Sequence, residues 1–414
     1  MRFPRRAWMI AAAACLAFGG LLSVWLLDVK RTAVAPVARV TYQEGASRTE
    51  SVAMKAELHE LTEGMMRFET GAGAVVTVAA PAVFNLVSAE RIELTKGRMT
   101  ARMLREESRL VVSVGGFEVR DLGTAFGLDA RENSRSLLSV FEGEVAVSDG
   151  AGPGAGSKLS EGQSAVGGRG ANLGDFERTA FTPESFADLW PLTMGINEAS
   201  RLVEFLPPGP LLRPLREYRA NDRLFLLPER QGVSLSEALM VDLSPEVSAW
   251  PESPVSPYPL PAGKRVSSHL VFFQPEPSAP AGLRRLSGEI VFEEPVVGVL
   301  CSDSGLLASD GLLGVSGADY RTPGQRRGME EADKMHCRAS NLPHDSIRIG
   351  RDGHTLIFDL YVSDEREQMR VLVAADKSPP AFGAAVFLPP KAVSDRQTGG
   401  RKTDAPRFVH FNTR

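Results

Sequence analysis

Alternation of apolar and polar residues dominates the chain between residues 59 and 170. A period of two is typical of strands with one buried face, and clusters of Gly, Asn or Asp separate the segments. The segments are MMRFET (65–70), AVVTVAA (74–80), AVFNLVS (82–88), RIELTKG (91–97), RLVVSVGGFEVRDLG (109–123), AFGLDA (125–130), LLSVFEGEVAVSDG (137–150) and KLSEGQSAV (158–166). This pattern predicts an all-β domain, preceded by a stalk with a first strand (32–58).

Alternation returns further along the chain. A Pro-rich stretch at 171–215 is expected to be a linker, in which Thr182 and Pro183 could start a short helix. The later segments are RLFLLPE (223–229), LMVDLS (239–244), HLVFFQP (269–275), GEIVFEE (288–294), VVGVLCS (296–302), TLIFDLYVS (355–363) and QMRVLVA (368–374). They predict a jelly-roll-like β-sandwich at 216–375, followed by a partly disordered tail at 376–414. The expected fold class is therefore mainly β.

The first 31 residues have a different pattern. Ala7–Leu27 contains no charged residue and is about as long as a helix that crosses a bilayer, about 20 residues. Arg2, Arg5 and Arg6 precede it, so a single-pass anchor in the inner (cytoplasmic) membrane, with a cytoplasmic N-terminus and an extracytoplasmic body, is expected. A cleaved signal peptide is the alternative, with Ala33-Val34-Ala35 as its site.

The length and the net charge of the chain limit the number of domains and the classes of partner that are expected. The 414 residues are enough for two or three domains, and the net charge of −4 provides no basic field for nucleic acid. We therefore expect no nucleic-acid partner.

Asp121 and Thr124, in the stretch GFEVRDLGTAFGLDA, could be read as a catalytic pair or as a turn. Gly123 permits a positive φ, and an Asp side chain can accept hydrogen bonds from the backbone two residues on. No histidine or cysteine lies within thirty residues of Asp121. The pattern therefore favours a bend between two strands, with Phe117, Val119, Phe126 and Leu128 facing the core.

Four motifs follow in a fixed order over about 80 residues, at Arg91–Gly97, Val119–Leu128, Val140–Val147 and Leu159–Gln163. Together they resemble the periplasmic domain of FecR-type proteins, the membrane partners of extracytoplasmic-function sigma factors. The residues that carry the resemblance are Gly97, Leu122, Gly123, Thr124, Phe126, Glu142, Gly143, Gly162 and Gln163. The resemblance implies a non-catalytic β domain that acts in envelope signalling and anti-sigma-type regulation, or as a scaffold.

One feature departs from the family. FecR-type regulators carry a helical anti-sigma segment of several dozen residues before the membrane helix, whereas six residues precede Ala7 here. Direct contact with a sigma factor is therefore not expected from this stub. An envelope protein or a surface glycan is the expected partner, and the alternative function is a cell-surface adhesion or carbohydrate-binding structural protein.

The second domain resembles a β-sandwich module of large surface proteins in Planctomycetes and Verrucomicrobia. The resemblance rests mainly on Gly288–Phe292, Pro295–Val299, Arg327–Glu330 and Met369–Val371. It implies a fold and an extracytoplasmic location, with no activity attached.

Candidate chemistry is sparse. Cys301 and Cys337 could form a disulfide in an oxidising compartment, or could be two buried thiols. No cofactor is expected, and a calcium site is the alternative. Its candidate residues are Asp303, Asp310, Glu330, Glu331, Asp333, His336 and His344. Trp190 and Trp250 could cap the two cores or present a sugar platform. No spacing indicates a nucleophile with its base, so an enzyme is not expected.

Overall fold

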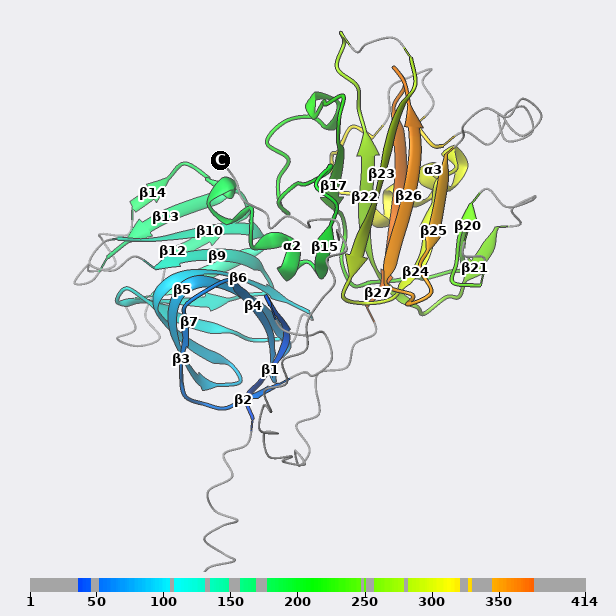
Figure 1. Cartoon of the computed structure of the whole chain (residues 1–414). Coiled ribbons are helices and arrows are strands. Elements are labelled where there is room, and N and C mark those ends of the chain that lie inside the picture. The colour runs from blue at the N-terminus through cyan, green and yellow to red at the C-terminus, as the bar shows by residue number, and fades with distance from the viewer. Residues whose placement is uncertain are drawn as a thin grey trace, which may run out of the picture.

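The strands form two β units in the computed structural model. The structure describes residues 36–45, 52–104, 108–130, 135–148, 157–168, 177–246, 249–250, 257–278, 282–320, 327–329 and 345–375. Figure 1 shows the first unit in blue to teal and the second in green to orange, with α2 and β15 where the two units meet. The mainly β fold class predicted from the alternation is confirmed.

The first unit is one highly curved sheet. Its path is β12-β11-β8-β7-β6-β5-β4-β1-β2, and β3, β9, β10, β13 and β14 pair off this path. The strands are β1 (Ala38–Gln43), β2 (Ala53–Met54), β3 (Leu58–Leu61), β4 (Met65–Thr70), β5 (Ala74–Ser88), β6 (Arg91–Met103), β7 (Val111–Val114), β8 (Phe117–Asp121), β9 (Ala125–Ala130), β10 (Ser136–Glu142), β11 (Glu144–Ser148), β12 (Ser157–Ser160), β13 (Gln163–Gly167) and β14 (Glu177–Thr179). The buried apolar residues of β1 to β13 line one core.

The long strands β5 and β6 form the centre of this sheet. The first half of β6 pairs with β7, and its second half pairs with β9. Gly97 lies where β6 passes from one partner to the other and has a φ of +113°. A Cβ at this position would lie 2.5 Å from the Cβ of Ala82 on β5. Because both the backbone angle and the space exclude a side chain, only glycine fits this bend.

The second unit consists of two facing sheets with a shared core. One has the order β15-β23-β26-β25-β20, and the other has the order β16-β17-β22-β27-β24, with β18 beside β22. A small pair, β19-β21, forms a separate two-stranded sheet whose Val241 and Leu260 pack against residues of β22, β24 and β27. The strands are β15 (Ile196–Ala199), β16 (Val203–Phe205), β17 (Leu224–Pro228), β18 (Val233–Ser234), β19 (Leu239–Val241), β20 (Ala249–Trp250), β21 (Tyr258–Leu260), β22 (Arg265–Phe273), β23 (Arg284–Phe292), β24 (Val296–Leu300), β25 (Ser346–Ile349), β26 (Thr355–Val362) and β27 (Glu367–Ala374).

The segment expected to be a linker contributes to both units. β14 pairs with β13 of the first unit, whereas β15 and β16 pair with β23 and β17 of the second. Between them lie the 3₁₀ helix η2 (Pro183–Phe186) and the helix α2 (Trp190–Thr193). The second unit thus includes strands that precede residue 216, because Ile196 and Val203 are buried in its core.

The helix α3 (Asp303–Leu313) was not expected from the alternation. Ser302 caps it, since its hydroxyl accepts a hydrogen bond from the Gly305 amide at 3.2 Å. A further 3₁₀ helix, η3 (Leu215–Glu217), precedes β17. Among the described residues no helix is long and apolar enough to cross a membrane; Ala7–Leu27 lies outside them.

Candidate functional site

The junction between the two units begins with an aromatic cluster on the first unit. Trp190 of α2 is fully buried, and its ring lies 4.5 Å from the ring of Phe141 on β10. Phe186 of η2 covers Gly127 on β9, where a Cβ would lie 2.8 Å from the ring. Large side chains from 183–194 therefore fill space that the sheet leaves open. Trp190 caps the first core, which is one of the two roles predicted for it.

Polar contacts fix the same segment. Arg98 on β6 makes two hydrogen bonds to the Asp188 carboxylate, at 2.8 and 2.6 Å. The hydroxyl of Thr193 lies 2.6 Å from that of Thr100 and 2.7 Å from that of Thr77, and all three residues are buried. Because a bidentate arginine pair fixes orientation as well as distance, α2 has one defined position on β5 and β6.

Arg67 on β4 joins the two units directly. Its guanidinium forms an ion pair with Glu293, which follows β23 of the second unit, and donates to the Leu192 carbonyl at 2.8 Å. Its Nε donates to the Thr41 hydroxyl at 2.9 Å. Arg67 is only 2% exposed, and Asn197 donates a further hydrogen bond to Glu293 at 3.2 Å. The contact therefore connects the first sheet, α2 and the sandwich at one point.

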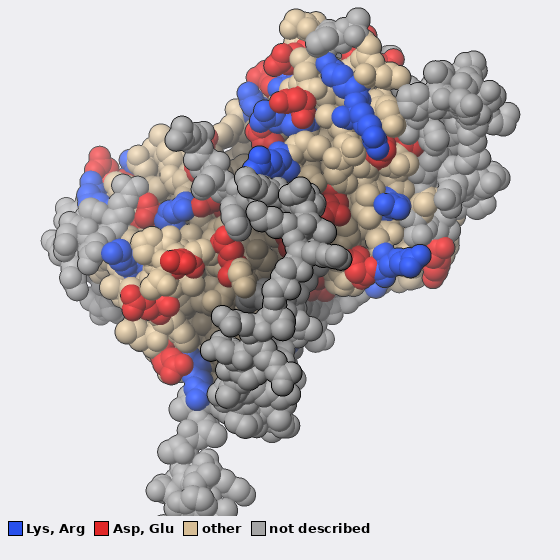
Figure 2. All heavy atoms as spheres, viewed as in Figure 1, with Lys and Arg blue, Asp and Glu red and all other residues tan. Residues whose placement is uncertain are grey.

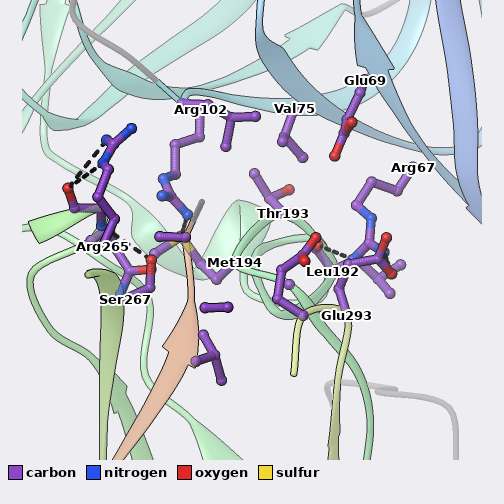
Figure 3. A pocket seen from close by; sticks show the side chains of 18 residues that line it. Arg67, Glu69, Val75, Arg102, Leu192, Thr193, Met194, Arg265, Ser267 and Glu293 are labelled. Carbon is purple, nitrogen blue, oxygen red and sulfur yellow. Dashed lines mark hydrogen bonds and ion pairs between the residues drawn. The ribbon is translucent and has the colours of Figure 1, made fainter. Parts of the chain in front are cut away.

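A pocket opens beside this contact, with an empty volume of about 700 Å³ that includes its mouth. Figure 3 shows Arg102 and Arg265 on one side of the pocket and Arg67 with Glu69 and Glu293 on the other. Both units contribute to the lining.

Burial perturbs several ionisable groups around the pocket. Desolvation lowers the pKa of Arg102, and the charge of Glu142 partly offsets this effect. Burial raises the pKa of Glu142, although Arg102 opposes this rise. Burial and the Arg102 charge lower the pKa of His269 on β22 to about 3. At neutral pH His269 is therefore uncharged, while Arg102 remains cationic.

Several of the family-motif residues lie at turns of the first unit, whereas Phe126 and Glu142 lie in β9 and β10. The Asp121 carboxylate accepts hydrogen bonds from the amides of Gly123 at 3.0 Å and Thr124 at 2.8 Å. Gly123 has a φ of +97°. The predicted turn is confirmed, and Phe117, Val119, Phe126 and Leu128 are buried as expected.

The remaining motif positions surround this turn. Gly143 has a φ of +75°, and a Cβ there would lie 2.8 Å from the Thr124 side chain. Gly162 has a φ of +72°, and Gln163 accepts a hydrogen bond from the Ser160 amide at 3.0 Å. Leu122 is 46% exposed. Gly97 lies at the bend of β6. The backbone angles at the motif glycines therefore explain why these positions are glycine.

The candidate calcium ligands that the structure describes have protein partners. Asp303 accepts hydrogen bonds from the amides of Arg327 and Gly328, at 3.0 and 2.5 Å. Asp310 forms ion pairs with Arg327 and Arg370, at 2.6 and 3.1 Å. Both carboxylates stabilise α3 and its surroundings. Glu330, Glu331, Asp333, His336 and His344 lie outside the described residues.

Cys301 is fully buried at the end of β24, in the core of the sandwich. Cys337 lies outside the described residues, so the pairing of Cys301 with Cys337 stays a prediction. The side chain of Trp250 is likewise not described.

The outer face of β26 carries the stripe Ile357, Asp359 and Tyr361, all partly exposed. Arg285 on β23 makes a bidentate pair with Asp359, at 2.7 and 2.8 Å, and its guanidinium lies 5.9 Å from the centre of the Tyr361 ring. On the face drawn in Figure 2, basic and acidic side chains are interspersed over both units.

Comparisons with known proteins give limited similarity. No family model and no curated protein matches the chain. Two crystal structures of a candidate anti-sigma factor from Parabacteroides distasonis ATCC 8503 are similar to part of it. The first, at 17% identity and a TM-score of 0.26, covers 34% of this chain and 68% of that chain. The second, at 19% identity and a TM-score of 0.27, covers 32% and 65% respectively.

Sequence reasoning missed Arg67, Arg102, Gln231 and Glu293, which build the junction and its pocket. Arg67 and Glu293 are 226 positions apart, and no local motif marks either residue. The nearest available signal was the apolar content of 186–194, which is unusual for an exposed linker.

Proposed function

We propose that this chain is a FecR-like, non-catalytic protein of the cell envelope, anchored through Ala7–Leu27, whose two β units act in signalling or scaffolding outside the cytoplasm. Its contacts are made by β surfaces, and the second unit is the jelly-roll-like module expected from the sequence.

The observation that carries this proposal is the placement of the motif residues. Gly97, Gly123, Gly143 and Gly162 have positive φ values at bends and turns of one sheet. Asp121, the one acidic side chain beside Thr124, is used by the turn itself. Backbone geometry and turn hydrogen bonds thus account for these positions of the FecR-like motifs, which supports a non-catalytic role.

The junction supports a relay in particular. Arg67–Glu293 and Arg98–Asp188 tie the first sheet to α2 and to the sandwich. Because packed interfaces of this kind rearrange as units, a ligand on one β unit could bias the position of the other.

Accessibility in intact cells tests the location. The variant Arg285→Cys places a thiol on the exposed face of β23, whereas Cys301 is buried. A membrane-impermeant maleimide should label Arg285→Cys in intact cells and leave the parent chain unlabelled at that position. Labelling only after lysis would contradict an extracytoplasmic body.

Transcription tests the signalling role. Deletion of the gene should change expression of a regulon controlled by an extracytoplasmic-function sigma factor, and the wild-type gene should restore it. An unchanged transcriptome across envelope stresses would favour scaffolding.

Carbohydrate binding is the second candidate, favoured by the Asp359–Tyr361 stripe with its Arg285 pair. Polysaccharide binding by the full chain should fall in Tyr361→Ala and persist in the matched variant Tyr258→Ala. The absence of binding across polysaccharides would remove this candidate.

A further inference from the structure

One guanidinium in the pocket at the junction, that of Arg102, has no oxygen acceptor among the residues that the structure describes. The Nη1 of Arg102 donates a long hydrogen bond, of 3.9 Å, to the sulfur of Met194. Thioether sulfur is a weak acceptor. Arg67 pairs with Glu293, and Arg265 donates to the Gly232 carbonyl at 3.2 Å, so Arg102 differs from both other arginines in the lining.

The surroundings of Arg102 do not supply the missing acceptor. Glu142 acts on Arg102 electrostatically, but among the described residues no hydrogen bond or ion pair joins the two. His269, buried and neutral, makes no hydrogen bond through either ring nitrogen within the part of the chain that the structure describes. A partly buried charge of this kind is costly unless an anion pairs with it.

A second group in the same pocket also has an unused hydrogen-bonding atom. Gln231 donates from its amide nitrogen to the carbonyls of Glu229 at 3.0 Å and Ser268 at 2.8 Å. These bonds fix the orientation of the amide, and its Oε1 is buried with no donor among the described residues. Because buried acceptors are nearly always satisfied, this atom calls for an N–H or O–H from a ligand or water.

The rest of the lining limits the ligand. Val75, Leu104, Met194 and Val373 provide apolar walls. Three carboxylates, Glu69, Glu293 and Glu294, balance the three arginines of the lining, so the pocket has no net positive charge that would favour a dianion such as phosphate. A single negative charge on an aliphatic body fits these walls better.

We propose that the pocket binds a small organic monocarboxylate that also carries a hydroxyl or amino donor, with its carboxylate on Arg102 and its donor on Gln231 Oε1. This proposal concerns binding alone and stands separately from the envelope role.

Calorimetric titration of the full chain, purified in detergent, tests the proposal. The probes are 2-hydroxy-4-methylpentanoate, leucine, 4-methylpentanoate and inorganic phosphate. At least one of the first two should bind saturably, and more tightly than 4-methylpentanoate, which lacks the donor. Absence of saturable binding up to about 10 mM, or tighter binding of phosphate, would overturn the proposal.

Variants locate the site. Arg102→Gln should weaken binding roughly ten- to hundredfold, and Gln231→Leu roughly three- to tenfold. Arg223→Gln, the same change at an exposed position of the second unit, is the matched control and should bind as the parent does. Unchanged affinity in Arg102→Gln would overturn the assignment. If that variant does not fold, hydrogen exchange of the parent chain decides: the probe should protect 102–104 and 231–232, and protection elsewhere alone would refute the site.

Discussion

Replacement of Arg67 by Ala should destabilise the folded chain, because Arg67 forms an ion pair that joins the two units. The change removes the Glu293 ion pair and the hydrogen bonds to Leu192 and Thr41. Breaking a buried ion pair by removing one partner typically costs about 3–5 kcal/mol. Glu293 is 20% exposed and keeps the Asn197 donor, so the expected loss is somewhat smaller, about 2–4 kcal/mol.

Urea unfolding followed by circular dichroism measures this loss, and Arg285→Ala at an exposed pair is the control that should leave the midpoint unchanged. A double-mutant cycle with Glu293→Gln should give a coupling of about 1 kcal/mol or more. The reasoning is refuted if Arg67→Ala costs less than about 1 kcal/mol or if the two changes are simply additive.

Two further substitutions test the fold. Gly97→Ala should cost about 2–4 kcal/mol, because the new Cβ would collide with Ala82, whereas Gly123→Ala, with a similar φ but nothing within 4 Å, should cost only about 1 kcal/mol in thermal or urea unfolding. Equal losses of stability in the two variants would contradict the argument that steric crowding at Gly97 adds to the cost. For His269 the folded pKa of about 3 lies below the ordinary value of 6.5, so the unfolded chain binds more protons between these values and stability falls as the pH drops through that window. Between pH 7 and pH 4.5 this should cost about 2–3 kcal/mol, and His269→Leu should abolish that part of the slope; an identical slope in the variant would contradict a buried neutral imidazole.

Local signals predicted the strands and turns well. MMRFET corresponds to β4, AFGLDA to β9, and the Asp121–Thr124 turn has the hydrogen bonds that its residue types indicate. Each of these features depends on residues within a few positions of one another. Periodicity therefore carried enough information to define them.

The junction required information that periodicity does not contain. Arg67 and Glu293 meet across 226 positions, and Trp190 is buried by Phe141, a partner in a distant strand. The helix α3 was missed although Ser302 and Asp303 provide a cap and an acidic first turn, because its two glycines and weak apolar periodicity resemble a loop. The structure of these regions therefore depends on tertiary packing.

The order β14, α2, β15 has a consequence for how such a protein can be rearranged by recombination. α2 completes the core of the first unit, and β15 begins only two residues after it as the edge of a sheet in the second. A cut before this stretch leaves the first unit with an exposed apolar surface, because α2 is lost. A cut after it leaves the second unit without its edge strand β15. The two halves are thus expected to be inherited together, and useful truncations should overlap across 177–205.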